Sequence, residues 1–174
     1  EHENPMALVA GWLRERRLAA RPVAIEETTR EFIRDGLQRQ LPHAALISGA
    51  SQVRAVRMRK TAAEIALMQI ANTITLNALR YAAKRTQKGM TPADITALVV
   101  DATRRQGGDA DGGLVLLGEA AAYPHGSRQR QEVREGEVVL LDCGCRVHGY
   151  SSDISRTFVY GEPSAEVRRV WNHV

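Results

Sequence analysis

Apolar residues recur along this chain with two different periods. Five stretches repeat them every three or four positions, which predicts amphipathic helices, and shorter runs rich in β-branched residues predict strands. Thr61 and Thr91 are each followed three positions later by an acidic residue, Glu64 and Asp94, which is the spacing of a capping box. The predicted helices cover residues 4–13, 28–41, 61–87, 91–106 and 164–174, and the predicted strands cover 21–25, 44–47, 112–117 and the two arms of 138–159. We therefore expect an α/β protein.

The order of these elements divides the chain near Val56. Residues 1–55 alternate helix, strand, helix and strand, and two strands are too few for an independent domain. We expect this segment to be the last part of an α/β domain, followed by a second domain that begins with the long helices. The first helix, introduced by Asn4 and Pro5, carries an apolar stripe made of Met6, Leu8, Val9, Trp12 and Leu13.

Residues 138–159 read as a hairpin that carries two carboxylates. An apolar run leads to Asp142, a polar turn follows, and a second strand-like run carries Asp153. If the turn centres on Val147 and His148, the two aspartates lie directly opposite each other, with Cβ atoms roughly 5 Å apart. Two ionised carboxylates at that separation repel each other unless a cation lies between them, so the pattern predicts a divalent metal site. Two unrelated surface carboxylates are the alternative, because a one-residue change of register would destroy the pairing.

A turn before the hairpin carries an imidazole at its tip. Pro124 and Gly126 flank His125 and restrict the backbone on both sides. On residue types alone, a solvated loop histidine is a commoner explanation of this pattern than a catalytic one.

Three pieces of the chain resemble, in the same order, the pita-bread metallopeptidases. Residues 141–145 (LDCGC) and 149–158 (GYSSDISRTF) resemble the metal-binding signature of that family, and residues 122–126 (AYPHG) resemble its substrate-binding histidine motif. The family includes methionine aminopeptidase, aminopeptidase P and prolidase, with creatinase as a metal-free relative. The segment before Val56 resembles the end of the extra N-terminal domain of the prolidases, aminopeptidases P and creatinase, which favours the proline-directed branch.

The resemblance implies a pita-bread (creatinase/aminopeptidase) fold. Residues 1–55 would form the C-terminal part of a creatinase-like N-terminal domain with its linker, and residues 56–174 the N-terminal half of the catalytic domain. The family's other metal ligands, one histidine and two glutamates, would come from a second half that this sequence does not contain.

The resemblance also implies a function and the residues that perform it. The complete protein would cleave the Xaa-Pro bond of dipeptides, or the N-terminal Xaa-Pro bond of longer peptides, with a hydroxide bridging two divalent metal ions. Manganese is the expected metal, with zinc and cobalt as alternatives. Asp142 and Asp153 would be metal ligands, and His125 would be a catalytic residue that binds substrate and stabilises the tetrahedral intermediate. The implied partners are a proline-containing peptide, the second half of the enzyme and a second copy in a homodimer.

Two other functions stay open at this point. One is a pita-bread domain kept as a non-catalytic binding module, and the other is a related metal-dependent hydrolase that acts on a different amide. Relatives that have lost their metals commonly lose the aspartates, so the presence of both Asp142 and Asp153 argues against the binding module.

Composition and charge narrow the remaining possibilities. A chain of 174 residues with 44% hydrophobic and 25% charged residues is typical of a globular protein. The net charge of +4 comes from scattered basic residues without a nucleic-acid-binding motif, so we expect no nucleic-acid partner. No apolar run approaches the roughly 20 residues of a membrane span, so we expect no membrane partner either. The only cysteines, Cys143 and Cys145, lie two positions apart on a predicted strand, which predicts free buried thiols and a reducing, cytoplasmic setting.

Overall fold

The chain folds into two compact units, Glu1–Lys60 and Thr61–Val174, each of which is described by itself. The computed structural model describes residues 4–173. The boundary predicted after residue 55 falls inside helix α3 (Ala50–Met58), which the apolar pattern did not predict because no residue of α3 is buried. Among residues 4–173, no helix has the length and the apolar character that a membrane crossing requires.

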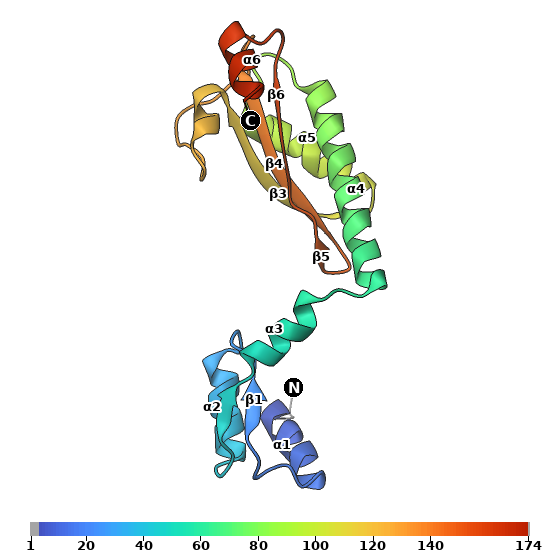
Figure 1. Ribbon diagram of the computed structural model, residues 1–174, viewed down its shortest axis with the longest axis vertical. Helices are drawn as coiled ribbons and strands as arrows, with labels where there is room; N and C mark the ends of the chain where they lie inside the picture. Colours follow the sequence, from blue (N-terminus) through green and yellow to red (C-terminus); the bar gives the residue numbers. More distant parts are fainter. Residues whose placement is uncertain (1–3, 174) are drawn as a thin grey trace. The chain divides into compact units, whose positions relative to one another are not determined.

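The first unit follows the predicted order of helix, strand, helix and strand (Figure 1). Asn4 caps the first helix by accepting hydrogen bonds from the backbone N–H groups of Met6 and Ala7. The two strands pair in parallel, with Val23 opposite Leu46. The elements are α1 (Pro5–Glu15), β1 (Val23–Ile25), α2 (Glu31–Gln40), β2 (Leu46–Ser48) and α3.

Only part of the predicted apolar stripe of α1 is buried. Leu13 packs into the core of the first unit together with Ala10. Leu8, Val9 and Trp12 keep 59%, 48% and 50% of their surface exposed. The stripe therefore predicted the helix correctly, but this unit covers only one side of it.

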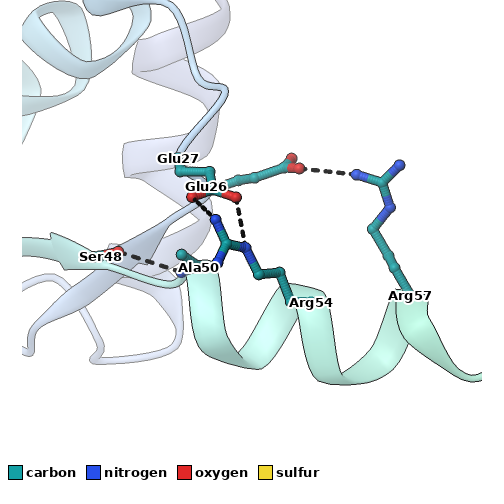
Figure 2. Close-up of polar contacts among 6 residues, drawn as sticks. All are labelled: Glu26, Glu27, Ser48, Ala50, Arg54 and Arg57. Atoms are coloured by element: carbon teal, nitrogen blue, oxygen red, sulfur yellow. Dashed lines mark hydrogen bonds and ion pairs between the residues drawn. The ribbon is translucent and has the colours of Figure 1, made fainter.

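Polar contacts hold α3 to the rest of the first unit (Figure 2). Arg54 donates from two guanidinium nitrogens to the carboxylate of Glu27, and Arg57 pairs with Glu26 at 3.1 Å. Ser48 accepts a hydrogen bond from the N–H of Ala50 at the start of the helix. Each exposed ion pair contributes about 0–1 kcal/mol, so these contacts set the direction of α3 more than they stabilise the unit.

The second unit is an antiparallel sheet with two long helices on one face (Figure 1). Strand β4 pairs with β3 on one side and with β5 and β6 on the other. Both predicted capping boxes are confirmed, at Thr61 with Glu64 and at Thr91 with Asp94. The elements are α4 (Ala62–Arg85), α5 (Pro92–Arg105), β3 (Asp109–Leu117), the 3₁₀ turn η1 (Gly118–Ala122), β4 (Val138–Val147), β5 (Tyr150–Ser151), β6 (Ile154–Val159) and α6 (Ala165–Trp171).

Alternation along β4 gives the sheet two different faces. Val139, Leu141, Cys143 and Cys145 are at most 2% exposed and lie on the face that α4 and α5 cover. Successive strand residues point to opposite faces, so Asp142 lies on the face without these helices. Each fully buried aliphatic side chain contributes about 1.5–3 kcal/mol, so the core fixes which face Asp142 occupies.

Candidate metal and substrate site

The hairpin turn lies one residue later than the sequence predicted. Val147 pairs with Tyr150, which makes His148 and Gly149 the two turn residues, and both have positive φ, +48° and +85°. A two-residue turn of this kind requires positive φ at both positions, and glycine adopts it without strain. The predicted centre at Val147 and His148 was therefore wrong, because it placed Gly149 in the strand.

The same change moves the partner of Asp142. Asp142 lies opposite Ser155, and the predicted direct pairing with Asp153 is wrong. Asp153 is instead a diagonal neighbour, and such positions are about 7–8 Å apart. Ser152 is buried against α4 and the next residue, Asp153, is exposed, so Asp153 still lies on the same face as Asp142. A metal ion between the two carboxylates is therefore expected from their shared face and not from direct opposition.

Neighbouring polar groups hold the hairpin on either side of the aspartates. The Ser155 hydroxyl donates to Oδ1 of Asp142 at 2.5 Å. At the other end, the Tyr150 hydroxyl donates to Oε1 of Glu64 at 2.7 Å, which joins the tip of the hairpin to the first turn of α4. This hydrogen bond raises the pKa of Tyr150, and burial adds to the effect.

Both cysteines are free and buried, as predicted. They lie on the helix-covered face, away from Asp142. Burial, with a further contribution from the negative charge of Asp142, raises the pKa of Cys143 to about 11. The thiol is therefore neutral at physiological pH, which makes it a packing group.

The segment between β3 and β4 brings His125 to the face that carries Asp142. Residues 123–126 form a turn in which the Gly126 N–H donates to the carbonyl of Tyr123. A side chain at Gly126 would contact Leu114, which lies directly opposite Asp142 across the sheet. His125 is exposed and lines an open groove of about 580 Å³, to which Leu114 and Leu116 contribute from β3 and Thr91, Pro92 and Ala93 from the start of α5.

The two aspartates fit a metal site as part of its ligand set. Carboxylate oxygens are suitable ligands for manganese, magnesium and zinc. Within residues 4–173, however, no group of three or more histidine, cysteine, aspartate or glutamate side chains is arranged to hold a metal ion. Asp142 and Asp153 would need further ligands from outside this part of the chain.

Comparison with known proteins assigns the chain to a family. Residues 66–174, more than half of the chain, match the model of metallopeptidase family M24. The chain belongs to this family. An uncharacterised peptidase of Schizosaccharomyces pombe is 32% identical over 180 residues, which include the whole of this chain and 38% of that protein. This M24 chain therefore spans less than half the length of that curated relative.

Solved structures place the M24 chain among larger enzymes of the same fold. The X-Pro aminopeptidase from Thermotoga maritima matches with a TM-score of 0.87 and 25% identity, over 99% of this chain and 49% of that structure. The Xaa-Pro dipeptidase from Bacillus anthracis matches with a TM-score of 0.85 and 25% identity, over 99% of this chain and 48% of that structure. The predicted fold class, half of a pita-bread fold preceded by α/β elements, is confirmed.

Proposed function

We propose that this chain is the first part of a metal-dependent peptidase that hydrolyses Xaa-Pro bonds, either in dipeptides or at the N-terminus of peptides. One observation carries the proposal: Asp142, Asp153 and the turn with His125 belong to the same open face of the sheet, although His125 lies well before the hairpin in sequence. The similarity to an X-Pro aminopeptidase and an Xaa-Pro dipeptidase supports the substrate class.

The proposed metal ligands in this chain are Asp142 and Asp153. The remaining ligands, one histidine and two glutamates, would come from a second half of the enzyme. Two divalent ions, manganese with zinc or cobalt as alternatives, would lower the pKa of a water molecule and polarise the peptide carbonyl. The carboxylates would balance the charge of the ions and, through Ser155 on Asp142, hold them against the sheet.

His125 would bind the substrate near the bond that is cleaved. His125 is exposed in the groove beside β3, where its imidazole can reach a bound peptide. A hydrogen bond from the imidazole to the carbonyl oxygen would become stronger as negative charge develops there. The turn that carries it is held by Gln131, whose side chain accepts from the N–H of Leu117 and donates to the carbonyl of Ser127.

The experiment is hydrolysis of Ala-Pro and of a longer Xaa-Pro peptide by the full-length protein. We expect cleavage with added manganese and none after treatment with a chelator. The preferred peptide distinguishes a dipeptidase from an aminopeptidase. Manganese-dependent cleavage of other dipeptides without cleavage of Xaa-Pro bonds would contradict the substrate class and favour a related amide hydrolase, and absence of any cleavage by a metal-loaded protein would favour a binding module.

Two variants test the roles of the residues. Asp153→Asn keeps the shape of the side chain and removes its charge, so we expect loss of both manganese binding and activity. His125→Ala removes a group that acts on the substrate, so we expect kcat to fall roughly 100-fold while manganese affinity stays unchanged. Equal loss of manganese affinity in both variants would contradict the separate roles.

A further inference from the structure

The backbone of the hairpin departs from a regular ladder immediately before Asp153. Between β4 and β5 the pairs are regular, and β6 continues in the same register, but Ser152 and Asp153 lie outside both strands. At Ser152 one expected bond is present, from its N–H to the carbonyl of Cys145 at 2.9 Å. In a regular antiparallel pair, the N–H of Cys145 would donate in return to the Ser152 carbonyl.

The side chain of Ser152 receives that second hydrogen bond. The N–H of Cys145 donates to Ser152 Oγ at 3.0 Å. The Ser152 carbonyl oxygen lies so close to Gly144 that a Cβ atom on that residue would collide with it. The same Cβ position would be 3.7 Å from the Cα of Asp153. The hydroxyl therefore occupies the ladder position of the carbonyl, which allows the peptide bond leading to Asp153 to turn.

Thr75 of α4 forms a further hydrogen bond with this hydroxyl. Thr75 Oγ1 lies 2.7 Å from Ser152 Oγ, and the two residues are only 1% and 7% exposed. The Ser152 hydroxyl can donate to the Cys145 carbonyl at 3.2 Å while it accepts from the Cys145 N–H and from Thr75. Both hydroxyls of this cluster then have partners, although Thr75 and Ser152 are 77 positions apart.

We propose that Thr75 and Ser152 are positioning residues for Asp153. Their hydrogen bonds keep the turned peptide before Asp153 in one conformation, so that its carboxylate is held at a constant place relative to Asp142. The proposal rests on the proposed function, in which both carboxylates bind metal. Groups that orient metal ligands from behind commonly change metal affinity 10–100-fold when they are removed.

The test is manganese binding by the full-length protein, measured by calorimetric titration after the metal has been removed. Thr75→Val keeps the shape of the side chain and removes the hydroxyl, and we expect the manganese Kd to rise about tenfold or more. Ser152→Ala should weaken binding at least as much, and Thr75→Ser, which restores the hydroxyl, should bind nearly as tightly as the parent. The matched control is Thr86→Val at the C-cap of the same helix, which removes a buried hydrogen bond to the Ala82 carbonyl.

Thermal unfolding of the same variants separates positioning from general destabilisation. We expect Thr75→Val and Thr86→Val to lower the Tm by similar amounts, while only Thr75→Val weakens manganese binding. The proposal would be overturned if Thr75→Val bound manganese as tightly as Thr86→Val and Ser152→Ala bound it as tightly as the parent protein.

Asp153→Asn in the same titration distinguishes this result from failure of the proposed function. If Asp153→Asn loses manganese and Thr75→Val does not, only the positioning role is wrong. If Asp153→Asn binds manganese as tightly as the parent, Asp153 is not a ligand and both proposals are wrong.

Discussion

Asp142 has a single close polar neighbour from the facing strand. The Ser155 hydroxyl donates to its Oδ1, and the backbone pairing places the two residues directly opposite each other. A serine in this position restrains the rotation of the carboxylate and leaves the second oxygen available to a ligand. At the scale of single residues, then, each aspartate of the proposed site has its own support, Ser155 for Asp142 and Ser152 for Asp153.

Removal of the Ser155 hydroxyl should weaken metal binding. In Ser155→Ala the carboxylate of Asp142 loses its donor and gains rotational freedom, so we expect the manganese Kd of the full-length protein to rise roughly tenfold. Ser155→Thr should retain most of the affinity because the hydroxyl remains. Ser51→Ala, at an exposed position of α3 in the other unit, is the control and should leave the titration unchanged. An unchanged Kd in Ser155→Ala would show that the hydrogen bond to Asp142 does not support the ligand.

At the scale of elements, the helices depend on caps that the sequence displays. Thr61 and Thr91 accept from the N–H groups of Glu64 and Asp94, and the acidic side chains accept in return from the N–H groups of the two threonines. These contacts join residues three apart, so they form wherever the local sequence allows a helix. They therefore explain why Thr61 and Thr91 were predicted correctly as the caps of α4 and α5.

The cap of α5 should make stability depend on pH. Hydrogen bonds from the backbone and then the side chain of Thr91 lower the pKa of Asp94 from its usual 3.8. A lowered pKa in the folded state means that folding stabilises the charged form of Asp94. The cap's contribution to the free energy of unfolding is therefore present above pH 4 and is lost as the pH falls through the folded pKa. We expect Asp94→Asn to unfold at lower urea concentration than the parent at pH 7, with a smaller difference at pH 3. A difference that is equal at both pH values would contradict the charge-dependent cap.

The hairpin shows what local signals cannot decide about an element. Both arms were predicted from their apolar and β-branched residues, and both exist as β4 and β5–β6. The register was wrong because the predicted turn used Val147 and His148, whereas the two residues with positive φ are His148 and Gly149. The start of β3 also differed from the prediction, because the strand begins at Asp109 and not at Gly112.

At the scale of the whole molecule, the open face of the second unit is the main unexplained surface. A hollow of about 1,170 Å³ lies along β6 and α6, and Val170 and Trp171 at its edge are 51% and 62% exposed. It contains neither aspartate nor His125. The chain spans about half the length of the solved structures it matches, so we expect the second half of the enzyme to cover this surface and complete the ligand set.

Residues 1–174 expressed alone should therefore lack peptidase activity. Two aspartates cannot hold two metal ions without further ligands, and residues 4–173 contain no larger group of suitable side chains. We expect no manganese-dependent hydrolysis of Ala-Pro by this chain, compared with the full-length protein under the same conditions. Activity of the 174-residue chain as a pure monomer would contradict the need for additional ligands. The homodimer implied by the resemblance stays a prediction, which light scattering on the full-length protein tests.

By itself, the sequence determined the elements that depend on near neighbours: the capped helices, the strands and the α/β class. It also provided, in Asp142, Asp153 and His125, the residues of the candidate site, whose roles stay predictions. Only the tertiary structure decided that Asp142 faces Ser155 and that the His125 turn lies over the same face. These features depend on turn conformation, and on contacts such as that between Thr75 and Ser152, which join distant parts of the chain and have no local signal.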